Sequence, residues 1–234
     1  MITLENIDKK FGKNLVLNNI NLNFEENKVT AVLGPNGSGK TTLIKIILGL
    51  VKPALGKVYV DDFDISNGFL YRGKLGYMPQ IAKYPENLTA NELLSMISDV
   101  RENKNINPNN IINAFKLNAE MEKPFKSLSG GTKQKISALI AFVFNPSILI
   151  LDEPTAGLDP VSSSYFKDLI NKEKQNKKTV ILTSHILNDV QELADDIVFI
   201  LEGKIKYKGS VESLLKDQNE KKLERAIADL MKQE

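Results

Sequence analysis

A glycine-rich segment between two apolar runs constrains this chain most. Residues 34–42 read Gly-Pro-Asn-Gly-Ser-Gly-Lys-Thr-Thr, which fits the pattern G-x-x-x-x-G-K-[ST]. The run before it, 29–33, is apolar and β-branched, as is typical of a buried parallel strand. The run after it, 42–50, predicts a helix that a glycine stops. A strand, a glycine-rich loop and a helix in this order predict a site for the phosphates of a nucleoside triphosphate.

The residue types of this loop suit phosphate binding. Glycines let the backbone curl so that successive N–H groups converge on an anion, and the start of the helix adds partial positive charge there. Lys40 is placed to reach the β- and γ-phosphates, and the Thr41 hydroxyl to ligate Mg²⁺. The alternative is a turn that happens to hold Lys and Thr. The candidate nucleotide-binding residues are Gly34, Pro35, Asn36, Gly37, Ser38, Gly39, Lys40, Thr41 and Thr42.

Composition excludes several kinds of function. The 31 basic and 29 acidic residues leave a net charge of +2, which argues against a nucleic-acid partner. The chain has no cysteine and one histidine, so a thiolate or histidine metal cluster is excluded. No apolar run approaches the ~20 residues that span a bilayer, and the start lacks a signal-peptide core. We expect a cytoplasmic chain whose membrane part, if any, is another polypeptide.

The order of apolar patterns predicts an α/β fold with two additions. Residues 2–7 and 15–24 alternate like antiparallel strands, and Phe11 is expected in the loop between them, where it could stack on a base or simply pack. Residues 81–145 read as helices, around 91–100, 109–115 and 132–144. We therefore expect a P-loop NTPase fold with a mostly parallel sheet, an N-terminal antiparallel β-subdomain and an inserted α-helical subdomain. The expected division is a core of 1–80 and 146–209, a helical subdomain of 81–145 and a helical tail of 210–234.

An acidic pair ends a second apolar run. Residues 148–151 are Ile-Leu-Ile-Leu, and Asp152 and Glu153 follow. An acid at the carboxyl end of a parallel strand beside a phosphate loop can hold Mg²⁺, and a second acid can polarise an attacking water. An ordinary turn after a strand is the alternative, and the phosphate loop upstream favours the functional interpretation.

A serine and two glycines, Ser129, Gly130 and Gly131, open another predicted helix. This arrangement also presents N–H groups to an anion, although a glycine pair before a helix is usually just a turn. The segment alone does not indicate an anion site, and only the other motifs in the chain favour that interpretation.

Taken together, these motifs resemble the ATP-binding subunit of ABC transporters over nearly the whole chain. The motifs that carry the resemblance occur in the family's order: Phe11 at the adenine-stacking position, 34–42 as Walker A, Gln80 as the Q-loop glutamine, 128–134 as the signature motif, 148–152 as Walker B with Glu153 beside it, 156–159 as the D-loop ending in Asp159, and His185 as the switch histidine.

The resemblance implies roles for these residues. It implies that Gln80 senses Mg²⁺ and the attacking water, that Asp152 holds Mg²⁺, and that Glu153 is the general base. His185 is implied to contact the γ-phosphate. Ser129, Gly130 and Gly131 are implied to reach ATP held by the opposite protomer, so the family implies a head-to-tail dimer with two ATP sites. Catalytic candidates are thus Lys40, Gln80, Glu153 and His185, and the metal candidates are Thr41, Gln80 and Asp152. The resemblance adds further nucleotide-binding candidates to the loop: Phe11, Ser129, Gly130, Gly131 and Asp159.

Departures from the family pattern are small. Gly157 stands in the D-loop where many members have another small residue, Lys135 replaces a common arginine, and Phe11 replaces the usual tyrosine. Lysine keeps the charge but not the bidentate fork, and stacking needs only a ring. We expect active hydrolysis of ATP with Mg²⁺ at both sites of a dimer.

The partner implied by the resemblance is an integral membrane permease, which would hold this chain on the cytoplasmic face of the membrane. Residues 84–88 are the candidate docking surface, or else a plain solvent loop. The single-domain layout resembles subunits paired with ABC-2-type permeases, and 77–89 resembles copper-processing subunits of nitrous oxide reductase maturation. A soluble ABC ATPase acting on a macromolecular machine is the alternative function. The short interval from Gln80 to Leu128 leaves no room for the long coiled coil of chromosome-maintenance relatives, and no guanine-reading motif is present.

Overall fold

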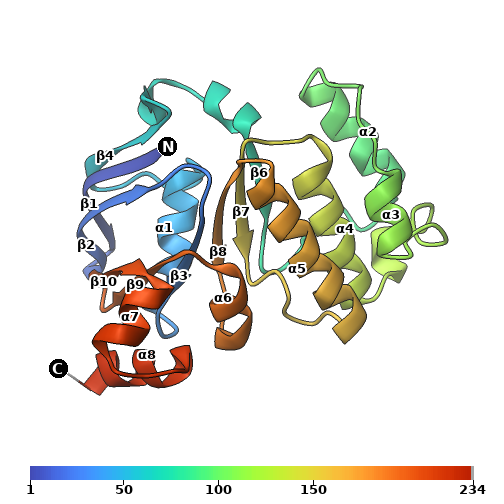
Figure 1. Ribbon diagram of the computed structural model, residues 1–234. Coiled ribbons are helices and arrows are strands. Elements are labelled where there is room, and N and C mark those ends of the chain that lie inside the picture. The colour runs from blue at the N-terminus through green and yellow to red at the C-terminus, as the bar shows by residue number, and fades with distance from the viewer. Residues whose placement is uncertain (233–234) are drawn as a thin grey trace.

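The computed structural model describes residues 1–232, which form two sheets with helices between and beside them (Figure 1). The larger sheet has the order β10-β9-β3-β8-β7-β6; all neighbours are parallel except β10, which pairs antiparallel with β9. Its strands are β3 (Val29–Leu33), β6 (Leu75–Met78), β7 (Ile148–Asp152), β8 (Thr179–Thr183), β9 (Asp196–Leu201) and β10 (Lys204–Ser210). Every residue of β3, β7 and β8 is buried, as their continuous apolar runs predict for strands covered on both faces.

The smaller sheet is wholly antiparallel, in the order β2-β1-β4-β5. Its strands are β1 (Ile2–Phe11), β2 (Asn14–Phe24), β4 (Leu55–Val60) and β5 (Phe63–Asp64). The first strand is longer than expected, because pairing with β2 continues to Phe11 opposite Asn14 and leaves only Gly12 and Lys13 for the turn. The expectation that Phe11 lies in a loop is therefore wrong.

Helices fill the space between the sheets and cover the outer face of the larger one. Residues 1–232 form α1 (Lys40–Ile47), α2 (Ala90–Val100), α3 (Asn109–Ala114), α4 (Gly130–Val143), α5 (Pro160–Gln175), α6 (Leu187–Leu193), α7 (Val211–Asp217) and α8 (Leu223–Lys232). Helix α1 lies between the two sheets (Figure 1), and its Leu43 and Ile47 belong to one apolar cluster with Ile20 of β2 and Val32 of β3. The P-loop helix is thus held from both sides.

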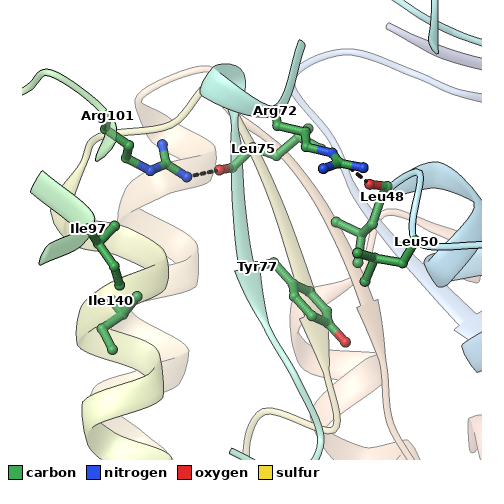
Figure 2. Close-up of a pocket in the computed structure, with 8 residues that line it drawn as sticks. All are labelled: Leu48, Leu50, Arg72, Leu75, Tyr77, Ile97, Arg101 and Ile140. Carbon is green, nitrogen blue, oxygen red and sulfur yellow. Dashed lines mark hydrogen bonds between the residues drawn. The ribbon is translucent and has the colours of Figure 1, made fainter. Parts of the chain in front are cut away.

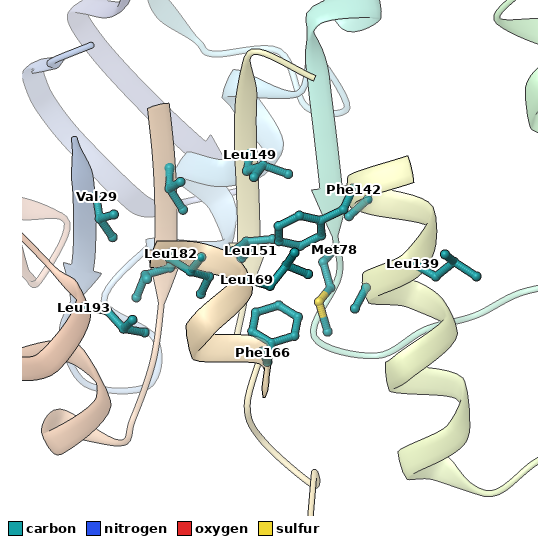
Figure 3. Packing of buried hydrophobic residues seen from close by; sticks show 14 of the residues in the cluster. Val29, Met78, Leu139, Phe142, Leu149, Leu151, Phe166, Leu169, Leu182 and Leu193 are labelled. Atoms are coloured by element: carbon teal, nitrogen blue, oxygen red, sulfur yellow. The ribbon is translucent and has the colours of Figure 1, made fainter. Parts of the chain in front are cut away.

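A second apolar cluster joins the other face of the larger sheet to α4 and α5 (Figure 3). Met78 of β6, Leu151 of β7 and Phe166 of α5 meet there. A Cβ added at Gly76 of β6 would lie 2.2 Å from the carbonyl oxygen of Ala141, so α4 approaches β6 as closely as only a glycine permits. The helical segment is consequently packed directly on the edge strand of the sheet.

Local sequence explains how the helical segment begins. Thr89 caps α2: its hydroxyl accepts from the Glu92 amide, while the Glu92 carboxylate accepts from the Thr89 amide. Leu93 and Leu94 then face the core. Tyr84, before this helix, donates its hydroxyl to Ser137 of α4, which ties the loop after β6 to the helices.

The C-terminal helices fold back on the core. Leu223, Ala226 and Ile227 of α8 are buried, and the Gln191 side chain of α6 binds the backbone of Lys221 and Leu223. Of the expected tail, residues 233–234 lie outside the described residues. Within 1–232, no helix has the length and apolarity to cross a membrane.

Candidate nucleotide-binding site

The P-loop has the backbone shape that its glycines predict. Gly34, Gly37 and Gly39 have φ values of 149°, 83° and 109°. A Cβ at Gly34 would lie 2.1 Å from the carbonyl oxygen of Ile200, and one at Gly39 would lie 2.6 Å from a methyl carbon of Leu17. The loop is therefore pressed between β9 and β2 and keeps its curl before any ligand arrives.

Lys40 is folded into this loop. Its ammonium donates to the carbonyl oxygens of Gly34, at 2.7 Å, and Pro35, at 3.0 Å, and the residue is buried. Burial lowers the pKa of Lys40, while the charges of Glu153 and Asp152 oppose that shift. A positive charge held in a partly desolvated loop is stabilised by an incoming anion, so the residue fits a phosphate site.

Ser38 adds a second observation inside the loop. Its hydroxyl oxygen is buried and has no hydrogen-bond partner within residues 1–232. Buried polar atoms are nearly always paired in folded proteins. The orphaned hydroxyl, beside a buried ammonium and a glycine-lined curl, fits a loop built to receive a polar ligand.

The acidic pair lies at the same edge of the sheet. Asp152 ends β7 and pairs in register with Thr183, the last residue of β8, which in turn pairs with Val32 of the P-loop strand. The Thr183 hydroxyl donates to the Asp152 carboxylate at 2.6 Å. Carboxylate and hydroxyl oxygens are the donors that Mg²⁺ prefers, so Asp152 and Thr41 suit that ion. The described residues contain no cluster of three or more acidic, histidine or cysteine groups.

Glu153 has an unusual backbone. Its φ of 53° is rare for a residue other than glycine, and the strain is held by two bonds from its amide, to the hydroxyl and carbonyl oxygens of Thr183. The carboxylate is buried; it accepts from the His185 amide at 3.0 Å and lies 3.1 Å from the His185 Nε2. Burial raises the pKa of Glu153, the bond from His185 lowers it, and the neighbouring charge of Asp152 raises it. The net shift is upward, which makes this carboxylate a stronger base than an exposed glutamate.

Gln80 follows the edge strand β6 of the larger sheet, whereas Phe11 belongs to the smaller sheet. Met78 pairs with Leu151, so Gln80, two residues on, follows β6 next to the end of β7, and its side chain is exposed. Phe11 ends β1 with 52% of its surface exposed and the Lys9 ammonium 4.7 Å from the ring centroid. An exposed ring on a hairpin that touches the P-loop is available for stacking on a planar ligand.

The signature segment does not join this group. Ser129 caps α4 by accepting from the Thr132 amide, and α4 packs on β6. Two strands, β8 and β7, separate β6 from the P-loop strand β3. Three strand spacings place β6 roughly 14 Å from β3. Ser129, Gly130 and Gly131 are solvent-facing or half-exposed, and one chain alone does not bring them to the phosphate loop.

The signature helix instead contacts the segment after Asp152. Gln134 donates to the carbonyl oxygen of Glu153 at 3.4 Å, and the Lys135 ammonium lies 2.9 Å from the Asp159 carboxylate. Asp159 also caps α5 by accepting from the amide and hydroxyl of Ser162. These bonds, with that from the Lys135 ammonium, hold the pKa of Asp159 well below its usual range.

Sequence reasoning missed three of these residues. Thr183 was not a candidate, Gln134 entered only as the end of the signature motif, and Lys135 entered only as the replacement of a common arginine. The signal for Thr183 is a threonine that ends a buried strand, and its importance follows from the pairing of that strand with β7, which ends in Asp152.

The fold and this edge define a P-loop nucleoside triphosphatase with a parallel core, an antiparallel sheet and a helical insertion. The family profile described as "ABC transporter" matches residues 17–156. The chain therefore belongs to the ABC transporter family, in the class of its ATP-hydrolysing cassettes, and the sequence-based predictions of family, fold class and ATPase activity are confirmed.

Relatives and solved structures agree with this assignment. The chain is 35% identical to the lantibiotic transport ATP-binding protein SrtF of Streptococcus pyogenes, over 93% of this chain and 97% of that one. It is 30% identical to the lipopolysaccharide export system ATP-binding protein LptB of Haemophilus influenzae, over 95% and 96%. A dimeric ATP-binding cassette in a post-hydrolysis state with ADP and Pi superposes with a TM-score of 0.81 at 26% identity, over 90% and 99%. An ATP-binding subunit of an ABC transporter has the same fold, with a TM-score of 0.92 at 24% identity over 99% of both chains.

Proposed function

We propose that this chain hydrolyses ATP at a site shared by two copies of itself, or by itself and a paired ATPase subunit, and so drives a separate membrane permease. The observation that carries the proposal is the division of the site. Lys40, Asp152 and Glu153 share one edge of the sheet, whereas Ser129 lies beyond it. A head-to-tail pair would bring Ser129 of each chain to the phosphate loop of the other.

The residues of the preformed edge have distinct proposed roles. Backbone N–H groups of the loop and the Lys40 ammonium bind the phosphates, and Phe11 stacks on the adenine. Thr41, Asp152 and Gln80 would hold Mg²⁺, which supplies charge neutralisation between the phosphates when it is bound. Ser129, Gly130 and Gly131 of the partner would cover the γ-phosphate, with Asp159 close to the seam.

The buried Glu153 is the proposed general base. Its carboxylate takes a proton from water, the water oxygen bonds to the γ-phosphorus, and the bond from that phosphorus to the bridging oxygen breaks to leave ADP. The upward pKa shift caused by burial favours proton acceptance. His185, already against Glu153, would contact the γ-phosphate and hold the base and substrate in one arrangement.

An apolar pocket at the seam of core and helices is the proposed docking site for the permease (Figure 2). Its volume is about 260 Å³, and it is lined by Leu48, Leu50, Arg72, Leu75, Tyr77, Ile97, Arg101 and Ile140. Leu50 is 59% exposed at this pocket, and both arginines are already bonded to backbone carbonyls. A helix with an apolar face suits such a site.

The segment 84–88 expected from sequence remains part of the proposed docking surface. Tyr84 turns inward, and its ring packs on Phe125 with centroids 4.9 Å apart. Pro85, Glu86 and Asn87 are exposed and available to a partner.

Further proposals concern the transported cargo, the class of permease and the division of the chain. The relatives are named for a lantibiotic, for lipopolysaccharide and, in a zinc import protein of Rickettsia conorii, for zinc, so similar cassettes serve unlike cargoes. An ABC-2-type permease and a copper-processing role rest on the sequence resemblance alone. Copper would have to be bound by partners, since the chain has no cysteine and one histidine. We also propose that 81–145 is a helical subdomain that carries the signature motif and that 210–234 is a C-terminal helical tail.

Co-purification tests the proposed function. Tagged Glu153→Gln chain, expected to hold ATP without hydrolysing it, is extracted with membranes in mild detergent, and a polytopic membrane protein is the expected partner. Leu50→Asp should lose that partner and keep ATPase activity, while Leu55→Asp, 65% exposed but outside the pocket, should keep both. Recovery of ribosomes or DNA-bound proteins without a membrane protein would favour the soluble ATPase instead.

A further inference from the structure

Thr183 occupies a central position that the proposed mechanism does not yet use. It is the last residue of β8, and it pairs with Val32 before the P-loop on one side and with Asp152 on the other. Its exposed fraction is 0%. A polar side chain so deeply buried is nearly always hydrogen-bonded, and the identity of its partners indicates its role.

The Thr183 hydroxyl makes two bonds to the acidic pair. It donates to Asp152 Oδ1 at 2.6 Å and accepts from the Glu153 amide at 3.1 Å. The first bond fixes the rotation of the Asp152 carboxylate. The second helps to hold Glu153 at its left-handed φ of 53°. One oxygen atom therefore orients both acids.

We propose that Thr183 is a positioning residue for ATP hydrolysis, whose hydroxyl sets the Asp152 carboxylate for Mg²⁺ and the Glu153 backbone for proton abstraction. The inference rests on the proposed roles of those two acids. Groups that hydrogen-bond to metal-binding carboxylates commonly matter about 10–100-fold for metal affinity or activity. Thr183 touches neither substrate nor metal in this account and acts only through its two neighbours.

Thr183→Val removes the hydroxyl with little change of shape. The Glu153 amide keeps its bond to the Thr183 backbone carbonyl, at 3.2 Å, so the variant unpairs only the Asp152 oxygen and loosens Glu153. Thr183→Ser keeps the hydroxyl and loses only the methyl group. The two variants together separate hydrogen bonding from packing.

The chain offers a matched control on the same strand. Thr179 begins β8, is also buried, and its hydroxyl accepts from the Asn27 amide at 3.2 Å. It lies ~13 Å along the strand from Thr183, away from the acidic pair. Thr179→Val thus makes the same chemical change in the same strand outside the site.

The experiment measures two quantities as a function of Mg²⁺ concentration: ATP turnover, and binding of a fluorescent ATP analogue. For Thr183→Val we expect turnover to fall about 10–100-fold, with a larger fall in kcat than rise in KM for ATP, and Mg²⁺-dependent binding to need more Mg²⁺. Thr183→Ser should restore most of both, and Thr179→Val should match the wild type. Circular dichroism confirms that each variant is folded.

Two results would overturn the inference: wild-type turnover and Mg²⁺ dependence in Thr183→Val, or a Thr183→Ser chain as impaired as the valine variant. If the valine chain does not fold, Thr183→Ser is compared with the wild type instead: wild-type turnover and Mg²⁺ dependence agree with the inference, and a loss of about 10–100-fold in a folded serine variant overturns it. Failure of the proposed function is recognised separately, because the wild-type chain would then not hydrolyse ATP. The comparison of Mg²⁺-dependent ATP-analogue binding between the wild type and the Thr183 variants still tests the inference in that case.

Discussion

The acidic end of β7 and the start of α4 differ in how completely one chain builds them. Asp152 and Glu153 are buried: the Asp152 carboxylate accepts from the hydroxyl of Thr183, the last residue of β8, and the Glu153 carboxylate accepts from the amide of His185, two residues beyond that strand. Ser129 and Gly130 are exposed, and within residues 1–232 the Ser129 side chain hydrogen-bonds only to Thr132 of its own helix. One chain thus prepares the acidic end of β7, and under the proposed function a second chain supplies the cover over the phosphate, so that hydrolysis depends on closure of the pair.

The largest effect is expected at the prepared end. Glu153→Gln keeps the shape and the bond from the His185 amide but removes the base, so turnover should fall about 10²–10⁴-fold. Nucleotide affinity should change little, since the phosphate loop is intact. Steady-state hydrolysis measures the turnover, and equilibrium ATP binding measures the affinity. Wild-type turnover in this variant would show that Glu153 is not the general base.

Paired glycine substitutions compare the stability of the two regions. Gly34→Ala places a Cβ 2.1 Å from a backbone carbonyl, and we expect a loss of at least about 2–3 kcal/mol in the free energy of unfolding. Gly130→Ala meets nothing within 4 Å and improves helix propensity, so stability should be unchanged or rise by about 0.5–1 kcal/mol. Denaturant unfolding of both variants checks this. Equal losses would contradict the difference between a tightly packed phosphate loop and an open start of α4.

Replacing the signature serine Ser129 with arginine tests whether the start of α4 contacts a second chain. Ser129→Arg should lower turnover about 10–100-fold and leave ATP binding to the single chain intact, with about 1 kcal/mol lost from the helix cap. Ser210 caps α7 in the same way, by accepting from the Ser213 amide, so Ser210→Arg is the matched control. Light scattering with ATP should show fewer dimers for Ser129→Arg only. Equal effects from both variants would indicate a helix-stability effect.

The smallest expected effect lies at the contact between the two regions. Lys135→Met removes a positive charge beside Asp159, so the pKa of that carboxyl should rise. It should stay below the usual value near 3.9, because the bonds from Ser162 remain. An NMR titration of the Asp159 carboxyl carbon measures this, with Lys133→Met as a control. An unchanged pKa would mean that the Lys135 contact does not hold in solution.

Much of the fold could be predicted because its signals are local. The strand before Gly34, the helix after it and the apolar run before Asp152 each follow from a few neighbouring residues. The length of β1 could not, since pairing with β2 carries the strand through polar residues to Phe11. Strand pairing overrides a loop-like composition there.

The residues of the site could be predicted from the sequence, but the contacts among them could not. The order of the motifs identified Asp152, Glu153 and His185 as candidates. The hydrogen bond from Thr183 to Asp152 depends on the register between two strands that are far apart in the sequence. The inward turn of Tyr84 was missed for the same reason, because Ser137 and Phe125 come from distant elements. Long-range packing decides such contacts, and neighbouring residues alone do not encode it.

The central claim is that one chain holds only half of the working site, and the most direct test is ATP turnover per chain over a thousandfold range of protein concentration. A site completed by a second chain predicts that turnover per chain rises in proportion to concentration in dilute solution and then saturates. Turnover per chain that stays constant down to the lowest concentration, with single chains confirmed by light scattering, would contradict the claim.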